Sequence, residues 1–281
     1  MVQLLQSISG IPKLINLLIT VDHLNRTIAI PSSVKRIVSL VPSQTELLAD
    51  LKLNDEVVGI TNFCIYPPEW FKSKNRVGGT KNFNINKIRE LNPDLIIANK
   101  EENSKSKLEI LINDYPVWIS DVRDLSSALD MINSVGKIVQ RESIATEIKN
   151  NIQKSFNDNI KLSSSVKKVA YLIWNNPLMT INQDTFIHQM ISINGWKNCF
   201  ASHSSRYPEI TMNELKESSP DLVFLSSEPF PFSSKHLNQF KKEIPSTKAV
   251  LVNGEYFSWY GSKLLKSPNY FNQLKRELFL D

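Results

Sequence analysis

Carboxylates that could take part in chemistry follow the apolar segments we expect to be strands. Four of them could form pairs: Glu101, Glu102, Glu228 and Glu255. Paired carboxylates can serve general acid–base catalysis, but sequence spacing does not show which of these four converge. Ser39 and Ser43 lack the GxSxG pattern of a nucleophile elbow, and the four histidines are not clustered. We therefore predict no catalytic residue and no metal site.

Aromatic residues are the commoner feature of the same segments. TNFCIYPPEW, WNNPLMT, SSEPFPF and NGEYFSWYG each follow an expected strand. Aromatic side chains contribute large contact area and lose little entropy, which suits a large, flat or amphipathic ligand. Any one of them could simply pack beneath a loop, but the set favours a binding surface. The ligand-binding residues predicted from these loops are Phe63, Cys64, Tyr66, Trp174, Met179, Glu228, Phe230, Glu255, Trp259 and Tyr260.

The elements that must position these loops read as strands alternating with helices. The expected strands are Arg36–Val41, Glu56–Ile60, Leu95–Asn99, Val117–Ser120, Lys168–Trp174, Leu222–Ser226 and Ala249–Asn253. Such alternation is typical of parallel βαβ units, in which ligands bind beyond the carboxyl ends of the strands. The fold class expected is α/β, with two Rossmann-like lobes that contain parallel sheets.

An internal repeat supports the division into two lobes. Ile85–Ala98 (INKIRELNPDLIIA) and Met212–Leu225 (MNELKESSPDLVFL) share a polar helix, a Pro-Asp turn and a short strand. Asn86 and Asn213 occupy the same position in this repeat, 127 residues apart. Because several elements recur in the same order, chance similarity of one turn does not explain the repeat.

A long helix is expected between the halves. Glu142–Lys161 carries apolar residues at four-residue spacing without Gly or Pro, and about 30 Å of helix would form a stiff connector. An ordinary surface helix is the alternative. We predict an N-terminal extension (1–18), an N-terminal lobe (19–139), a connecting backbone helix (140–162) and a C-terminal lobe (163–281).

Composition excludes several functional classes. The net charge of +5 is scattered along the 281 residues, which argues against a nucleic-acid partner. GxGxxG and GxxxxGK[ST] motifs are both missing, so a nucleotide cradle of the usual kind is not expected. Cys64 and Cys199 stand far apart and predict no zinc site. We expect a monomer that binds a small molecule.

The N-terminal sequence leaves the location open. The apolar stretch Leu14–Ile19 is preceded by one basic residue, Lys13, and no small-x-small cleavage site follows it. Secretory signals have a more basic start and a longer apolar core. The residues alone therefore favour a cytoplasmic location or an irregular leader.

The ordered motifs resemble a known family. They run from Arg36 to Gly261 as RIVSLVPSQTELL, GITNFCIYPPEW, RVGGTKNFNINKI, LNPDLIIANKEEN, YLIWNNPLMT, QDTFIHQM, RYPEITMNEL, EPFPF and SWYG. As a set they resemble the class III substrate-binding proteins of ABC importers, the helical-backbone metal receptors for vitamin B12, ferric siderophores and haem. The resemblance implies two lobes joined by one backbone helix, a cell-envelope or periplasmic location, and a cleft ligand that is cobalamin or a ferric or haem complex. It implies no intrinsic cofactor.

The resemblance also implies individual site residues. The positions that match the B12-binding pattern are Phe63, Thr80, Ile173, Met179, Tyr207, Glu255 and Trp259, which adds Thr80 and Tyr207 to the predicted set. Members of this family usually dock on an ABC permease through one acidic residue on each lobe. The matching residues are neutral, Asn86 and Asn213, with Glu90 or Glu214 as nearby substitutes.

Two other functions compete with a binding protein. A cytoplasmic tetrapyrrole- or corrinoid-handling enzyme, such as a metal chelatase, would need His and Glu together in the cleft. Only His203 among the histidines falls near such a loop. A structural, partner-binding module would leave the aromatic loops unexplained. We therefore expect a binding protein, not an enzyme, that serves ABC-type uptake.

Overall fold

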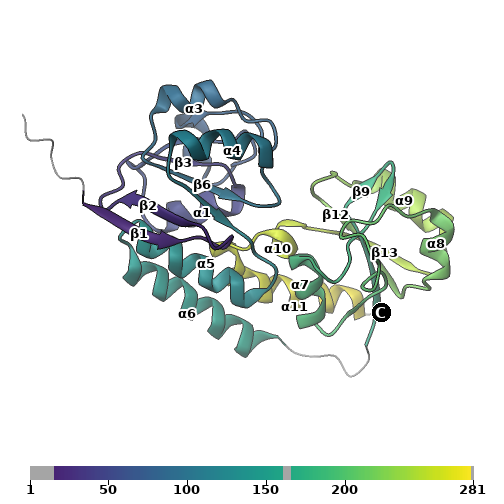
Figure 1. The fold of residues 1–281 in the computed structure, drawn as a ribbon. Helices are drawn as coiled ribbons and strands as arrows, with labels where there is room; N and C mark the ends of the chain where they lie inside the picture. The colour runs from purple at the N-terminus through teal and green to yellow at the C-terminus, as the bar shows by residue number, and fades with distance from the viewer. Residues whose placement is uncertain (1–15, 161–165, 280–281) are drawn as a thin grey trace, which may run out of the picture.

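The computed structural model describes residues 16–160 and 166–279 and contains two α/β lobes side by side (Figure 1). In the N-terminal lobe, five parallel strands run in the order β5-β4-β3-β6-β7. These strands are β3 (Ile37–Ser39), β4 (Val57–Ile60), β5 (Asn75–Arg76), β6 (Leu95–Asn99) and β7 (Val117–Ser120). The helices of this lobe are α1 (Pro42–Asp50), α2 (Pro68–Ser73), α3 (Ile85–Leu91), α4 (Lys105–Asp114) and α5 (Leu125–Ile138). An antiparallel hairpin, β1 (Leu17–Val21) and β2 (Thr27–Pro31), precedes the sheet.

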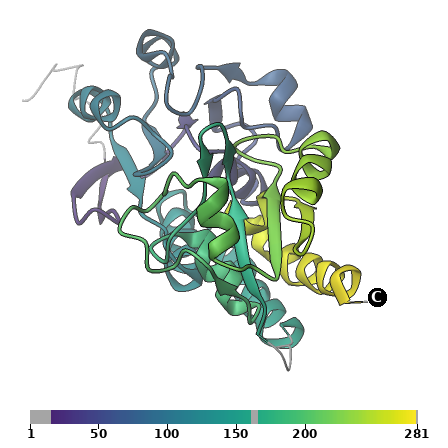
Figure 2. The ribbon, with the colours of Figure 1, turned by 90° about the vertical axis from the view of Figure 1, so that its right-hand side faces the viewer.

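The C-terminal lobe repeats this plan with four parallel strands in the order β11-β8-β12-β13 (Figure 2). Its strands are β8 (Lys168–Leu172), β11 (Lys197–Asn198), β12 (Leu222–Ser226) and β13 (Lys248–Val252), with a small hairpin of β9 (Trp174–Asn175) and β10 (Leu178–Met179). Its helices are α7 (Phe186–Ile193), α8 (Met212–Glu217), α9 (Ser234–Glu243), α10 (Glu255–Ser258), the 3-10 helix η1 (Ser262–Lys266) and α11 (Ser267–Phe279). The predicted fold class is confirmed, and all seven expected strands are present.

The repeat is structural as well as sequential. Asp94 accepts hydrogen bonds from the backbone of Lys35 (2.8 Å) and Arg36 (2.9 Å), which ties the start of β6 to the start of β3. Asp221 accepts the equivalent bond from the backbone of Lys168 at 2.7 Å and ties β12 to β8. The Pro-Asp turn thus does the same work in both lobes: its carboxylate aligns two neighbouring strands.

Alternate residues of each sheet pack into different cores. One face of both sheets contributes to a single main core, which includes Ile97 of β6 and Phe224 of β12 together with residues of α5, α6 and α11. The opposite faces form two smaller cores, one beneath α3 and α4 and one beneath α8 and α9. Strands buried on both faces explain the continuous apolar runs in the sequence.

The long helix between the lobes is α6 (Glu142–Asn159), and it begins and ends within two or three residues of the predicted bounds. It packs on α5, where a Cβ added to Gly136 would lie 2.2 Å from the Cβ of Ala145. Gly136 therefore permits the close approach of the two helices. The predicted domain boundaries stay a prediction, and most of the 1–18 extension lies outside the described residues. Over the described ranges, no helix is both long and apolar enough to cross a membrane.

Candidate functional site between the lobes

Loops at the carboxyl ends of the N-terminal strands contact segments of the C-terminal lobe. The loop after β4 carries Tyr66, whose ring lies 5.8 Å from that of Trp259 in an edge-to-face arrangement. The loop after β6 carries Glu101 and Glu102, which bond Tyr207 and Tyr260 respectively. Predicted ligand-binding residues of both lobes therefore meet, as strand-end positions in an α/β fold allow.

One of these contacts is centred on Lys263; we call Tyr66, Glu255, Trp259 and Lys263 the Lys263 cluster. The ammonium lies 2.5 Å from a Glu255 carboxylate oxygen and 4.2 and 4.5 Å from the ring centroids of Tyr66 and Trp259. Its side chain is only 8% exposed. An ammonium over electron-rich ring faces gains cation–π attraction, which is larger when water is excluded.

Burial and charge oppose each other at this ammonium. Burial lowers the pKa of Lys263, but the hydrogen bond to Glu255 and the charge of Glu46 outweigh it, so the pKa is raised overall. Glu46 lies 4.0 Å from the same ammonium, and burial raises its pKa to about 6 despite that attraction. The cluster thus holds one cation against two carboxylates from different lobes.

Glu228 is bound directly to this cluster. Its carboxylate accepts hydrogen bonds from the indole of Trp259 at 3.0 and 3.3 Å and from the hydroxyl of Ser258. Burial raises the pKa of Glu228, while these donors oppose the shift. Trp259 is 6% exposed and Tyr260 5%, so both are buried side chains rather than open platforms.

A second carboxylate joins the lobes below the surface. Glu102 accepts a hydrogen bond from the Tyr260 hydroxyl at 2.6 Å. Burial, reinforced by the charges of Glu228 and Glu101, raises the pKa of Glu102 to about 7. Burial likewise raises the pKa of Tyr260 well above its usual value. Glu102 is therefore poised to change charge near neutral pH.

The third contact is only partly buried; we call Glu101, Arg206 and Tyr207 the Glu101 cluster. The Arg206 guanidinium lies 2.5 Å from one oxygen of Glu101, and the Tyr207 hydroxyl donates to the other at 3.0 Å. Both charged side chains are 25% exposed, and Tyr207 is 39% exposed. Two successive C-terminal residues therefore close on one N-terminal carboxylate.

Other predicted residues offer exposed aromatic surface. Phe63 is 60% exposed and follows β4, and Trp174 is 38% exposed in the β9–β10 hairpin. The Trp174 ring lies 5.6 Å from Phe230, edge to face. Large apolar side chains that stay this accessible at strand ends are candidate contact points for an apolar ligand.

Three predicted residues have roles that the sequence did not reveal. Cys64 is fully buried, and its sulfur contacts the hydroxyls of Thr45 and Thr61, both at 3.1 Å. Burial raises the pKa of its thiol, so Cys64 is a core residue and leaves the candidate ligand set. Met179 is half-buried against the main core. The backbone carbonyl of Thr80 accepts from the Asn103 amide at 3.0 Å.

Sequence reasoning missed several residues at this interface. Glu101 and Glu102 were recognised as carboxylates but not assigned to the ligand-binding set, and Arg206 and Lys263 were not considered. Sequence position could have identified these two cations. Arg206 directly precedes Tyr207, and Lys263 is the second residue after the SWYG motif. A basic residue beside a predicted aromatic contact is a candidate partner for a carboxylate of the other lobe.

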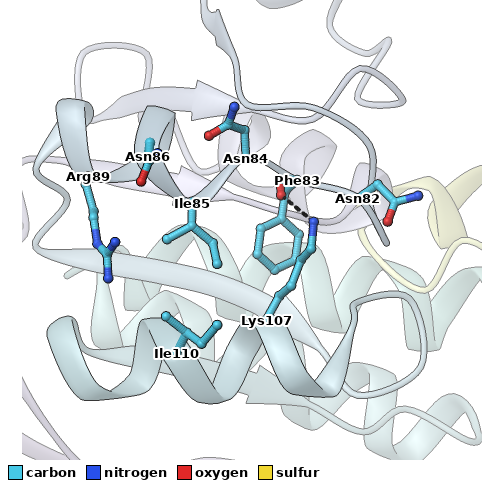
Figure 3. A pocket seen from close by; sticks show the side chains of 8 residues that line it. All are labelled: Asn82, Phe83, Asn84, Ile85, Asn86, Arg89, Lys107 and Ile110. Atoms are coloured by element: carbon cyan, nitrogen blue, oxygen red, sulfur yellow. Dashed lines mark hydrogen bonds between the residues drawn. The ribbon is translucent and has the colours of Figure 1, made fainter.

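One of the predicted docking residues lines a cavity outside the interlobe contacts. A cavity of about 510 Å³ lies between α3 and α4, and Figure 3 shows Asn86 and Arg89 on its α3 side with Lys107 and Ile110 on its α4 side. The Lys107 ammonium donates to the backbone carbonyl of Phe83 at 2.9 Å. No carboxylate is among the residues that line this cavity.

The second docking residue, Asn213, is exposed on α8, at the position equivalent to Asn86. Its neighbour Glu214 caps that helix: the Glu214 carboxylate accepts from the backbone and the hydroxyl of Thr211 at 2.6 and 2.8 Å. These bonds lower the pKa of Glu214. A carboxylate engaged in a capping box is not free to replace an acidic docking residue.

The family model for periplasmic binding proteins matches residues 37–250, about three quarters of the chain. The chain belongs to the periplasmic binding protein family. This family consists of solute-binding proteins, which favours the binding interpretation over the chelatase alternative. Among the residues that the structure places, no three His, Cys, Asp or Glu side chains gather in a way that could hold a metal ion.

Individual relatives agree with this membership. A vitamin B12-binding protein of Pectobacterium carotovorum is 25% identical over 236 residues, which covers 82% of this chain and 84% of the relative. The periplasmic vitamin B12-binding protein BtuF of Vibrio cholerae has the same fold, with a TM-score of 0.70 and 22% identity over 86% of this chain and 98% of that one. The periplasmic haem-binding protein HutB of Vibrio cholerae superposes with a TM-score of 0.72 and 21% identity, over 87% and 98% of the two chains.

Proposed function

We propose that this protein captures a corrinoid or an iron complex between its two lobes and presents it to an ABC-type importer in the cell envelope. The observation that carries the proposal is the convergence of aromatic strand-end residues from both lobes. Tyr66 and Trp259 meet across the lobes, and Phe63, Trp174 and Tyr207 lie in other strand-end loops and keep exposed rings. The relatives named above bind vitamin B12 and haem, both large, flat metal complexes.

The main core supports this mode of binding. Because α6 and the C-terminal helices belong to the same core as both sheets, the lobes share a rigid base. A rigid base with aromatic walls is preorganised, and preorganisation reduces the entropy lost when a ligand is ordered. The lobes then need to separate only at the exposed contacts to admit a flat ligand.

Docking on a permease is the second part of the proposal. Asn86 and Asn213 occupy equivalent exposed positions on the two lobes, and Glu214 is engaged in its helix cap. Neutral amides would give short-range hydrogen bonds without charge steering, so we expect association with the permease to depend only weakly on salt.

Ligand binding is tested by titration of the protein with cyanocobalamin, hemin and a ferric hydroxamate siderophore while tryptophan fluorescence is followed. Saturable quenching by one of them, without chemical change of the ligand, is the expected result. Absence of saturable quenching with all three would overturn the proposal. Chemical conversion of the bound complex would instead support the chelatase alternative.

Trp174→Ala sharpens this test because Trp174 is exposed and its loss should not perturb the core. We expect affinity for the quenching ligand to fall by about 2 kcal/mol, the usual cost of losing an aromatic anchor. Trp174→Phe keeps a ring beside Phe230 and should restore most of the affinity. Equal affinities of wild type and Trp174→Ala would move the binding surface away from the β9–β10 hairpin.

A further inference from the structure

The β6–α4 loop presents two adjacent carboxylates to different parts of the C-terminal lobe. Glu102 bonds the buried Tyr260, whereas Glu101 bonds the accessible pair Arg206 and Tyr207. The two contacts therefore differ in their access to water. Because solvent weakens ion pairs between exposed groups, the Glu101 contact is the one that opens more easily.

The loop itself is held firmly on the N-terminal side. The side-chain carbonyl of Asn99 accepts from the backbone amides of Glu101 and Glu102 at 2.8 and 3.0 Å. Asn103 donates to the backbone carbonyls of Leu40 and Thr80 at 3.1 and 3.0 Å. These bonds hold the backbone of the loop on the N-terminal lobe, so both carboxylates are presented from a fixed backbone.

The opposite side is also anchored, but only through the backbone. The backbone amide of Asn182 donates to the carbonyl of Arg206 at 3.0 Å, and the Asn182 side chain donates to the carbonyl of His203 at 3.0 Å. The side chains of Arg206 and Tyr207 extend from this anchored segment to Glu101. Side-chain rotation alone can therefore release them, without unfolding of either lobe.

Tyr207 connects this contact to ligand binding. It is one of the predicted ligand-contacting residues, yet its hydroxyl is bonded to Glu101. A ligand that uses Tyr207 must compete with Glu101 for it. Affinity for a ligand that binds only the open form is reduced by the fraction of molecules that are closed.

We propose that Glu101 is a positioning residue that closes the interlobe site in the absence of ligand, and that Arg206 and Tyr207 must leave it before a ligand enters. The inference rests on the proposed interlobe site but not on the identity of the ligand. Glu101 thereby sets the association rate: when its contact opens, this side of the interface widens, while the Glu102–Tyr260 bond and the Lys263 cluster prevent complete separation of the lobes.

The interlobe distance is measured first, without ligand. Spin labels on Asn113→Cys in α4 and Lys242→Cys in α9, both exposed positions, report the separation of the lobes by electron–electron double resonance. The half-exposed Cys199 is changed to Ser, and the buried Cys64 is kept. Glu101→Gln removes the ion pair and Tyr207→Phe removes the hydroxyl bond but keeps the ring. Both should broaden the distance distribution towards longer values.

The control is Glu109→Gln, which removes a carboxylate of the same lobe from the exposed pair with Lys105 (3.9 Å). It should leave the distances unchanged. Identical distributions in wild type, Glu101→Gln and Tyr207→Phe would overturn the inference, as would equal broadening in the control.

The association rate is measured next by stopped-flow quenching with cyanocobalamin and hemin. Glu101→Gln should raise the rate constant about two- to fivefold, the effect expected for loss of a partly exposed ion pair. An unchanged or lower rate constant would overturn the inference. If the wild type binds neither probe while the distances still broaden in Glu101→Gln, the closing role of Glu101 stands and the proposed ligand class fails.

Discussion

The Lys263 cluster and the Glu101 cluster use the same residue types to join the lobes, but their surroundings differ. Each contains a cation, a carboxylate and a tyrosine, with one of the three from the N-terminal lobe: Tyr66 in the first cluster and Glu101 in the second. Lys263 is 8% exposed and surrounded by aromatic rings, whereas Arg206 is 25% exposed. The degree of burial of the cation, more than the presence of an ion pair, should therefore decide which of the two contacts opens more easily.

Electrostatics explains why burial has this effect. Exposed ion pairs contribute little because water screens their attraction and both side chains lose entropy. A buried ion pair does not contribute more net stability than an exposed one. Removal of one partner is nevertheless costly, because the other charge is left without solvent or a counter-charge. Breaking the Lys263 cluster should therefore cost more free energy than breaking the Glu101 cluster.

Gly261 marks the closest backbone approach beside the Lys263 cluster. A Cβ at this position would lie 2.2 Å from the carbonyl oxygen of Ser43 in the other lobe, and neither backbone can yield easily. We expect Gly261→Ala to lower the free energy of unfolding by about 3 kcal/mol, as overpacking does. Urea denaturation measures the change through the transition midpoint.

Gly79 provides the matched control near the exposed aromatic residues. Its added Cβ would meet only Phe63 at 3.4 Å and Asn82 at 3.9 Å, which are ordinary contacts. Gly79→Ala should change the unfolding free energy by less than about 0.5 kcal/mol. A loss of stability as large as that of Gly261→Ala would contradict the distinction between the two regions.

Glu102 should make the stability of the protein depend on pH. Its folded-state pKa of about 7 lies above the usual value of 4.5, so the folded protein binds the proton more tightly than the unfolded chain does. This contribution is complete below pH about 4.5 and is lost as pH rises through about 7. It should lower the unfolding free energy by about 2.5 kcal/mol between pH 5 and pH 8.

Glu102→Gln isolates this effect from Glu46, which shifts in the same direction. The amide can still accept the Tyr260 hydrogen bond but cannot ionise. Urea midpoints of wild type and variant should diverge with rising pH, with the variant more stable at pH 8. Parallel pH profiles for the two proteins would show that Glu102 does not titrate in this range.

Lys263→Met removes the cation of the buried cluster and keeps a side chain of similar length. The carboxylates of Glu255 and Glu46 would lose their partner while only 15% and 19% exposed. Because both are partly accessible, we expect a loss of about 2 kcal/mol, less than for a fully buried pair. Chemical denaturation at neutral pH measures the change.

Lys100→Met is the exposed counterpart. Lys100 pairs with Asp121 at 2.9 Å but is 43% exposed, and Arg123 also binds that carboxylate. Its substitution should cost less than about 1 kcal/mol. Similar losses in Lys263→Met and Lys100→Met would show that burial does not decide the strength of these contacts.

The framework was predictable from the sequence because it depends on local patterns. Apolar runs of four to six residues and the Pro-Asp turns at Asp94 and Asp221 predicted strands that the structure contains. The two-residue strands β5, β9, β10 and β11 were missed, because so short a run has no readable period.

The site was less predictable because its contacts join residues far apart in the chain. Glu102 and Tyr260 are 158 residues apart, and no local pattern links them. Sequence position also did not distinguish exposed from buried members of one loop. Phe63 and Cys64 are neighbours in a turn that the Cys64 amide closes on the Thr61 carbonyl (3.2 Å), yet one is 60% exposed and the other is fully buried.

The single main core makes the folding of each lobe depend on the other. Since one face of each sheet, α6 and α11 pack into the same apolar interior, neither lobe completes its interior alone. Cutting the chain after α6 would expose apolar faces on both fragments, which should then aggregate or stay partly folded. The two lobes resemble separate bodies in outline, but they constitute one cooperative folding unit, and both should melt in the same transition.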